Sequence, residues 1–243
     1  MKTNDLSLRL FFESQYWATS YFCTFTYSDE YLPISSISGL PTLRQKDFQN
    51  FMKRLRKRIN CKCKVFYCGE YGGRTNRPHY HAILFGVPEE TLQMLDNIWK
   101  NGFVTTSPLT FARCRYCAKY MLKNEVFDYD FCFNHGIEPQ FICSSNRPGL
   151  GYQYILDNHM TLLRNFYIRY KGIKFAMPRY FYKKLKEIDE FYLQKLNNSL
   201  MQRYLRELKD NRLEFKYKTM EKLMSINNQR ELNLKSKLNL KGL

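Results

Sequence analysis

The sequence lacks any long hydrophobic run. Its first twenty residues are interrupted by Asp5, Arg9 and Glu13, so they contain no signal-peptide core, and no later window is apolar for long enough to cross a bilayer. Without an export signal, the eight cysteines are expected to be reduced thiols rather than a disulfide framework. We therefore expect a cytoplasmic protein with no membrane partner.

Acidic residues are also scarce. There are 22 Asp and Glu against 39 Lys and Arg, a formal net charge of +17. This imbalance argues against an enzyme for small neutral metabolites and favours a polyanionic partner, because a basic surface releases counterions from nucleic acid. At 44% hydrophobic residues the chain can bury a core, which argues against wholesale disorder. We expect a globular protein whose partner is nucleic acid.

Proline, cysteine and histidine are absent after residue 180, and glycine occurs there only at position 242. We therefore divide the chain into a mixed α and β domain at 1–180 and a tail at 181–243. The apolar residues of the tail recur at three- and four-residue steps, starting with Phe181 and Leu185, which predicts basic amphipathic helices. Such helices either pack on the domain or on a second copy, or contact nucleic acid or a host partner.

The first domain is predicted to combine strands and helices. Residues 21–27 are typical of a strand, and residues 43–59 of a helix with one apolar and one basic face. Two strand-like runs, 64–71 and 79–85, are joined by GGRTNRP, whose glycine, asparagine and proline are turn residues. These two runs are expected to form a β-hairpin. A further helix is predicted over 112–123.

The hairpin carries candidate metal ligands. Strand side chains alternate between faces, so His79 and His81 point the same way, and Glu70 lies on the partner strand within reach of them. Two imidazole nitrogens and one carboxylate can bind a divalent metal and leave coordination positions open for phosphate oxygens. The alternative is an exposed histidine pair that binds nothing.

The helix at 112–123 carries candidate nucleophiles. Tyr116 and Tyr120 are one helical turn apart and share a face, and each is followed three residues later by a lysine, Lys119 and Lys123. A phenolate can attack a phosphodiester to form a phosphotyrosine, while an ammonium group offsets charge that develops on the phosphate. The alternative is that both tyrosines belong to the core and the lysines extend into solvent.

Four blocks of the sequence resemble the HUH (His-hydrophobe-His) endonucleases, and among them the rolling-circle replication initiators of microviruses of the gokushovirus type. The blocks are CTFTYSDEYLP (23–33), GEYGGRTNRPHYHAILFG (69–86), YCAKYMLK (116–123) and SNRPGLG (145–151). In that order they resemble the family's first strand motif, its metal-binding hairpin, its two-tyrosine motif and a downstream segment rich in proline and glycine.

The resemblance implies a role for each candidate. The three hairpin residues would bind the divalent metal, Mg²⁺ or Mn²⁺, the two tyrosines would be nucleophiles, and the two lysines their electrostatic partners. Initiators of this family cut one strand at the replication origin, keep its 5′ end as a phosphotyrosine and leave a 3′-OH for the host polymerase. The second tyrosine later cuts the regenerated origin, and a closed circle is released. The implied partners are single-stranded origin DNA and the helicase and polymerase of a bacterial host cell.

Together these features predict an α+β fold, with the His-x-His hairpin at the centre of an antiparallel sheet, helices on one face and the basic helical tail following. Phosphate contacts are expected from the basic helix, through Lys53, Arg54 and Lys57, although such a face is often only solvated. Arg74 and Arg77, in the hairpin turn, are expected to clamp the DNA backbone.

Other functions also fit parts of the sequence. A plasmid or transposon HUH nickase would share the chemistry. A non-catalytic basic nucleic-acid-binding protein would keep its tyrosines in the core, and a metal hydrolase would use the histidine pair on another phosphoester. Cys61 and Cys63, together with Cys114 and Cys117, allow a four-thiolate zinc site, although we favour unpaired thiols, with the second pair packing its helix.

Overall fold

The computed structural model describes residues 2–119, 127–165 and 167–188, together with residues 198 and 202. No helix in these ranges is both long and apolar enough to span a membrane. The elements follow in chain order: α1 (Lys2–Ser14), β1 (Ser20–Tyr27), α2 (Gln45–Ile59), β2 (Lys64–Tyr71), β3 (Pro78–Phe85), the 3-10 helix η1 (Glu89–Met94), α3 (Leu95–Trp99), β4 (Gly102–Pro108), α4 (Phe111–Lys119), α5 (Tyr129–His135), β5 (Phe141–Ser144), α6 (Tyr152–Asn165), β6 (Tyr167–Tyr170), β7 (Ile173–Ala176) and α7 (Arg179–Ile188).

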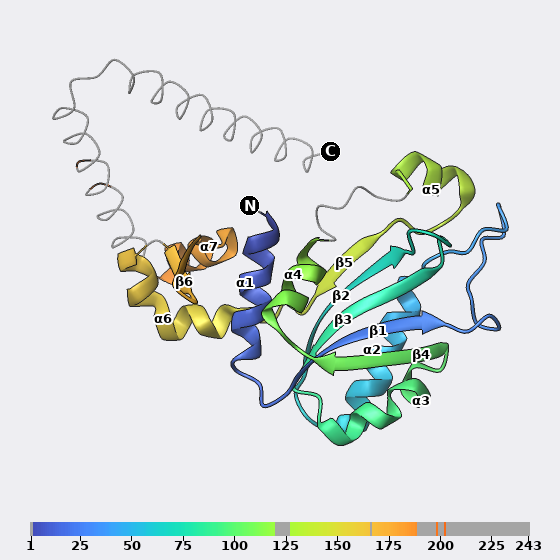
Figure 1. The fold of residues 1–243 in the computed structure, drawn as a ribbon, viewed down its shortest axis with the longest axis horizontal. Coiled ribbons are helices and arrows are strands. Elements are labelled where there is room, and N and C mark those ends of the chain that lie inside the picture. Colours follow the sequence, from blue (N-terminus) through green and yellow to red (C-terminus); the bar gives the residue numbers. More distant parts are fainter. Residues whose placement is uncertain (1, 120–126, 166, 189–197, 199–201, 203–243) are drawn as a thin grey trace, which may run out of the picture. The chain divides into compact units, whose positions relative to one another are not determined.

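A five-stranded antiparallel sheet forms the framework of the fold (Figure 1). Its strand order is β4-β1-β3-β2-β5, so β3 is the central strand and pairs with β2 as a hairpin. The α+β fold, the antiparallel sheet and the central position of the hairpin are therefore confirmed. A separate two-stranded sheet joins β6 to β7.

One face of the sheet packs against α2 and α3. Alternate strand residues point to this face, where Phe25 of β1, Tyr67 of β2 and Tyr80 of β3 are buried. The ring of Phe48, on the apolar face of α2, stacks on the ring of Tyr67 with centroids 4.1 Å apart. Trp99, at the end of α3, is fully buried beside the ring of Phe25. This cluster is the larger of the two apolar cores described.

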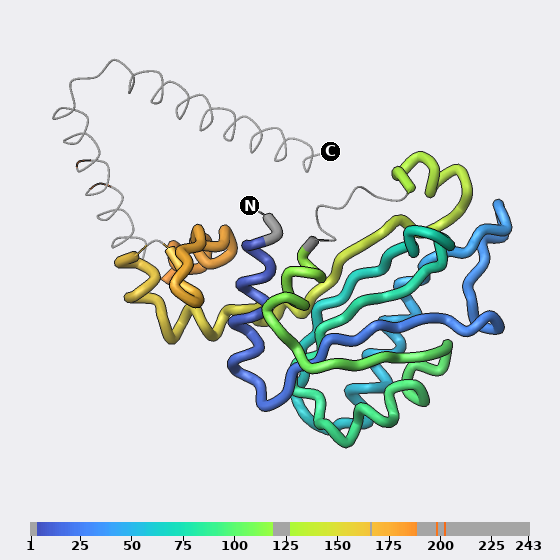
Figure 2. Tube along the Cα trace, in the orientation of Figure 1, coloured from blue at the N-terminus to red at the C-terminus, as the bar shows by residue number. Residues whose placement is uncertain are grey.

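The opposite face of the sheet packs against α1 and α4, which lie side by side in Figure 1 and Figure 2. Phe66 and Ile83 of the sheet contribute to a cluster with Leu10 of α1 and Cys117 of α4. The prediction of helices on one face only is therefore wrong. The reason is that β2 and β3 carry consecutive rather than alternating apolar residues, so nearly the whole of each strand is buried and both faces need cover.

The chain divides into two units, residues 1–188 and 189–243. Helix α7 belongs to the first unit. Its Phe181 and Leu185, the first apolar residues of the predicted tail, are buried, and the Phe181 ring lies 5.9 Å from the ring of Tyr154 on α6. The second unit lies almost entirely outside the described residues, so the helical form of the remaining tail stays a prediction, as does the predicted domain boundary.

Candidate active site

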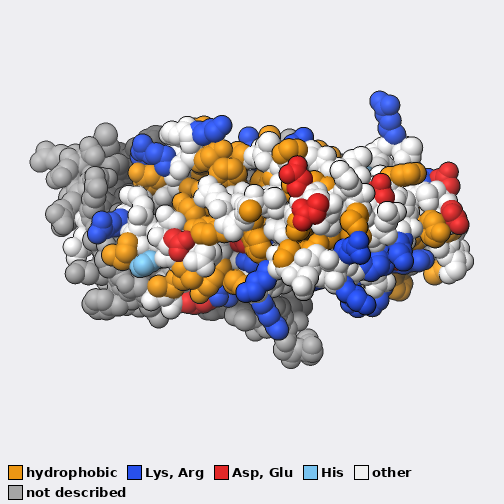
Figure 3. Space-filling view, turned by 90° about the horizontal axis from the view of Figure 1, so that it is seen from below, with side chains coloured by type: hydrophobic (Ala, Val, Ile, Leu, Met, Phe, Trp, Pro, Cys, Tyr) orange, Lys and Arg blue, Asp and Glu red, His pale blue; other side chains and the backbone are white. Residues whose placement is uncertain are grey.

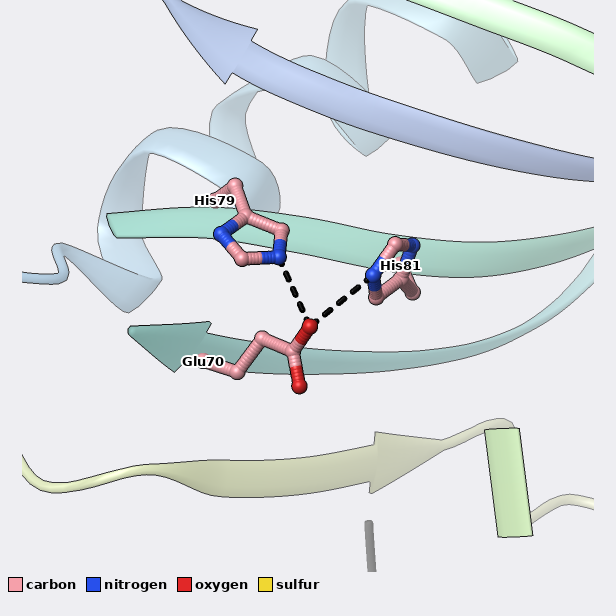
Figure 4. A group of neighbouring side chains, drawn as sticks. All are labelled: Glu70, His79 and His81. Atoms are coloured by element: carbon pink, nitrogen blue, oxygen red, sulfur yellow. Dashed lines mark hydrogen bonds and ion pairs between the residues drawn. The ribbon is translucent and has the colours of Figure 1, made fainter. Parts of the chain in front are cut away.

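Three side chains of metal-ligand type meet at the centre of the sheet, on the face that packs against α1 and α4. Glu70 of β2 and His79 of β3 are directly opposite each other, and His81 follows two residues later on the same face. Both imidazoles point toward one carboxylate oxygen (Figure 4): Glu70 Oε1 lies 2.7 Å from His79 Nε2 and 3.0 Å from His81 Nε2. The structure thus brings together the three residues predicted from the hairpin.

The other nitrogen of each histidine ring is also hydrogen-bonded. His79 Nδ1 lies 3.1 Å from the carbonyl oxygen of Arg77, to which it can only donate. His81 Nδ1 lies 3.0 Å from Thr24 Oγ1 on the neighbouring strand β1. These bonds orient the rings so that both Nε2 atoms face the Glu70 carboxylate.

Glu70 is ionised at neutral pH. Burial alone would raise the pKa of this carboxyl group, since only 4% of the residue is exposed. Hydrogen bonds from His79 and His81, together with their charges, outweigh burial and lower the pKa to about 2. The cluster therefore supplies a negative charge in a largely dry position.

The donor set fits a divalent cation. The ligand atoms of Glu70, His79 and His81 all lie within 4.8 Å of one another. The second carboxylate oxygen, Glu70 Oε2, is buried and has no hydrogen-bond partner among the residues that the structure describes. Leaving such an oxygen without a partner is costly, and a cation would satisfy it. No other group of three His, Cys, Asp or Glu side chains in the described ranges comes this close.

Tyr116 stands next to this cluster. Its helix, α4, turns Cys114, Cys117 and Ala118 into the core, where all three are fully buried, as expected for the two cysteines. Tyr116 points the other way and is 44% exposed. Its ring packs edge-to-face on the ring of His81, with centroids 5.3 Å apart. Tertiary packing of α4 therefore places a partly exposed phenol beside the histidines.

The other residues of the two-tyrosine motif are less fully covered. Lys119 is the last residue of α4, and its side chain is outside the description. Tyr120 and Lys123 lie outside the described residues altogether. The alternative zinc site gains no support, because Cys61 is exposed while Cys114 and Cys117 are buried in the core, and the four thiols do not come together.

Comparison with known proteins places this site in a family. Residues 20–125, which contain the cluster and α4, match the model of a family described as replication-associated protein ORF2. The matched residues belong to that family. A replication-associated protein ORF2 from Spiroplasma virus 4 is 30% identical over 200 residues, which is 72% of this chain and 61% of the relative. The resemblance to replication proteins of bacterial viruses, inferred from the sequence, is confirmed.

Two further relatives carry similar descriptions. The replication-associated protein VP4 of Bdellovibrio phage phiMH2K is 26% identical and matches 73% of this chain and 61% of its own length. For the replication-associated protein ORF4 of Chlamydia phage 1 the values are 25%, 84% and 56%. The chain thus spans about three fifths of the length of these relatives. A solved structure of hypothetical protein ORF119 from Sulfolobus islandicus rod-shaped virus 1 aligns with 49% of this chain and 91% of its own at 20% identity, with a TM-score of 0.32.

The two arginines of the hairpin turn, within the family-matched segment, differ in their surroundings. Arg77 donates to the carbonyl oxygen of Tyr27 at 2.8 Å and forms an ion pair with Asp29 at 2.8 Å, so it ties the turn to the segment after β1. Arg74 is exposed at the tip of the turn. The DNA clamp predicted for this pair stays a prediction, with Arg74 the more accessible of the two.

The basic side chains of α2 lie on the opposite side of the sheet from the cluster. Lys53 and Lys57 are exposed, whereas Arg54 donates to the carbonyl oxygens of Ile98 at 2.7 Å and Trp99 at 2.8 Å and so closes the end of α3. On the molecular face drawn in Figure 3, Lys and Arg side chains gather in a dense group. The predicted phosphate contacts of α2 stay a prediction, and DNA held there would not lie at the cluster.

Sequence reasoning missed two residues on the site face, Thr24 and Phe103. Thr24 contacts His81, and the alternation of β1 put it on a common face with Thr26 without indicating its partner. Phe103 lies on the edge strand β4, opposite Thr26, and is 65% exposed. Strand β4 was not predicted, and a single exposed aromatic residue gives no signal in a sequence until its strand is placed in a sheet.

Proposed function

We propose that this protein is a metal-dependent tyrosine endonuclease and strand transferase, which nicks single-stranded DNA at a phage origin to start and finish rolling-circle replication. The observation that carries the proposal is the contact between the partly exposed ring of Tyr116 and the ring of His81. A nucleophile beside a divalent-cation site is the arrangement that phosphoryl transfer requires. The relatives, which are named replication-associated proteins, support the same role.

Glu70, His79 and His81 would hold one divalent cation, Mg²⁺ or Mn²⁺. When bound, the cation polarises the scissile phosphate and offsets the charge that develops on its oxygens. The protein contributes a carboxylate that is ionised at neutral pH and two imidazoles already turned toward it. Because these groups are fixed on adjacent strands, little reorganisation is needed before the reaction.

Tyr116 would attack the scissile phosphorus. Its phenolic oxygen forms a bond to phosphorus while the bond from phosphorus to the 3′ oxygen breaks, so the 5′ end of the DNA is held as a phosphotyrosine. The phenol loses one proton and the departing 3′ oxygen gains one, which leaves a free 3′-OH for the host polymerase. Since one phosphodiester replaces another, the strand can later be rejoined without an external energy source.

The second tyrosine completes the cycle in this proposal. Tyr120 would attack the regenerated origin after one round of synthesis, and the waiting 3′-OH would then displace Tyr116 and close the circle. The ammonium groups of Lys119 and Lys123, each three residues after a tyrosine, would offset charge on the phosphate during the two transfers.

The site face also offers a surface for an unpaired strand. Phe103 is exposed on β4, two strand spacings from His79, which is roughly 10 Å. An aromatic ring in this position can stack on an unpaired base, and Arg74 at the hairpin tip can contact a phosphate. A base pair held in a duplex could not lie flat on the ring, which favours single-stranded DNA as the substrate.

A covalent-adduct assay tests the proposal. The full chain is incubated with single-stranded origin DNA and Mn²⁺, and the products are separated on a denaturing gel. We expect cleaved DNA and a protein–DNA adduct, and the loss of both in the Tyr116→Phe/Tyr120→Phe double variant. Tyr129→Phe, which alters an exposed tyrosine on α5, is the matched control and should leave the adduct unchanged.

Other outcomes would identify other functions. Metal-dependent cutting without an adduct would indicate a metal hydrolase. A shift of DNA on a native gel with neither cutting nor adduct would indicate a binding protein whose tyrosines are not nucleophiles. An adduct with plasmid or transposon end sequences, and none with phage origin DNA, would keep the chemistry and change the element that the protein mobilises.

A further inference from the structure

We propose that Thr24 is a positioning residue that holds the His81 ring so that its Nε2 atom is presented to the divalent cation; this inference rests on the metal site of the proposed function. Thr24 on β1 lies directly opposite His81 on β3, with their side chains on the same face. The distance from Thr24 Oγ1 to His81 Nδ1 is 3.0 Å. Thr24 itself contributes no ligand to the cluster.

The chemistry of a neutral imidazole explains why this bond matters. The ring carries one N–H, and a nitrogen that binds a metal must present a lone pair. With Nε2 of His81 directed at the cluster, the proton must lie on Nδ1, where Thr24 Oγ1 can accept it. For His79 the accepting group is the carbonyl oxygen of Arg77, at 3.1 Å. The two ligands therefore use different acceptors, and only the one at His81 is a side chain that substitution can remove.

The surroundings of Thr24 make it a rigid acceptor. It is β-branched, which restricts its side-chain rotamer, and its strand is hydrogen-bonded on both sides, to β3 and to β4. Phe22, two residues earlier on the same face, stacks on the His81 ring with centroids 5.4 Å apart and an interplanar angle of 20°. Strand β1 thus fixes the His81 ring twice, through its face by Phe22 and through its edge by Thr24.

Metal binding by variants of the DNA-free full chain tests the role of Thr24. Thr24→Val keeps the shape and removes the hydroxyl acceptor, and Thr24→Ser keeps the hydroxyl. Thr26→Val is the matched control, because Thr26 lies on the same face of the same strand and is hydrogen-bonded to the Phe103 carbonyl oxygen instead of a histidine. Affinity for Mn²⁺ alone is measured by isothermal titration calorimetry, and the urea midpoint without metal reports folding.

We expect Thr24→Val to weaken Mn²⁺ binding by about 10- to 100-fold, the usual effect of losing the partner of a metal-ligating histidine. Thr24→Ser and Thr26→Val should bind Mn²⁺ like the unmodified chain. In the Mg²⁺-saturated protein, ¹⁵N NMR should show a slowly exchanging Nδ1–H of His81 that is lost in Thr24→Val and restored in Thr24→Ser. If Thr24→Val does not fold, Thr24→Ala provides the same comparison.

Two results separate this inference from the proposed function. If the unmodified chain binds Mn²⁺ and Thr24→Val binds it equally well with the same Nδ1–H signal, Thr24 does not position His81, although the metal site stands. If the unmodified chain fails to bind Mn²⁺, the proposed metal site itself is refuted. Equal weakening in Thr24→Val and Thr26→Val would also overturn the inference, because it would point to damage of strand β1 in general.

Discussion

Replacing Leu10 with alanine should loosen α4 and so disturb the position of Tyr116. Leu10 is fully buried on α1, in the apolar cluster that also contains Cys117 and Ala118 of α4. These two residues form the inner face of the helix whose outer face carries Tyr116. The placement of the proposed nucleophile therefore depends on a helix that precedes the family-matched residues 20–125.

The size of the effect follows from the burial of Leu10. A buried Leu→Ala substitution costs about 2–5 kcal/mol, because apolar contacts are lost and a cavity remains. Each 1.4 kcal/mol is a factor of ten, so if this cost falls on the docking of α4, the helix opens roughly 30 to 4,000 times more often. Leu55→Ala is the matched control: Leu55 is equally buried, but on α2, against the opposite face of the sheet.

Native-state hydrogen exchange can measure this difference directly. Amides of α4 should lose protection in Leu10→Ala far more than in Leu55→Ala, and amides of α2 should show the reverse. Adduct formation with single-stranded DNA, measured at a temperature where both variants remain folded, should fall mainly in Leu10→Ala. Equal loss of α4 protection in both variants, or none in Leu10→Ala, would refute the reasoning that α1 holds α4 in place.

Three more substitutions address the site and its surroundings. His81→Ala should abolish cleavage of single-stranded DNA on a denaturing gel while leaving DNA affinity roughly unchanged; a large loss of affinity would count against a catalytic role. Phe103→Ala should weaken binding of single-stranded DNA by about 1–3 kcal/mol in fluorescence anisotropy, the value of one base stacked on an aromatic ring. Phe133→Ala, at an exposed ring on α5, is its control, and equal affinity in the two variants would contradict stacking. Arg54→Met should lower the free energy of unfolding in urea by about 1.5–3 kcal/mol through loss of its bonds to the end of α3, and Lys53→Met should not. An unchanged urea midpoint with weaker DNA binding would instead make Arg54 a phosphate contact.

The metal cluster could be predicted from the sequence because its geometry is local. Glu70 and His79 face each other across a short hairpin whose turn residues are recognisable, and His81 follows by strand alternation. In contrast, the contact between Tyr116 and His81 joins residues 35 positions apart, on elements whose packing depends on α1. Helical periodicity showed which residues share a face with Tyr116 but gave no information on what that face would meet.

The basic helix shows the same limit in the other direction. Its spacing correctly indicated that Phe48, Phe51 and Leu55 would be buried and that Lys53 would be exposed. It did not indicate that the whole helix would lie on the face of the sheet away from the cluster, or that Arg54 would bond to the carbonyl oxygens that end α3. Which side of a sheet a helix covers is decided by the handedness and length of its connections and by competition for apolar surface.

The sequence by itself determined the strong positive charge, the β-hairpin, the ligand set of Glu70, His79 and His81, and the resemblance to phage replication proteins, since composition and short-range periodicity are properties of the chain alone. Only the tertiary structure decided that helices cover both faces of the sheet, that Tyr116 lies over His81, and that Thr24 contacts the same ring. These contacts join distant segments, and they form because two apolar faces of one sheet must both be buried.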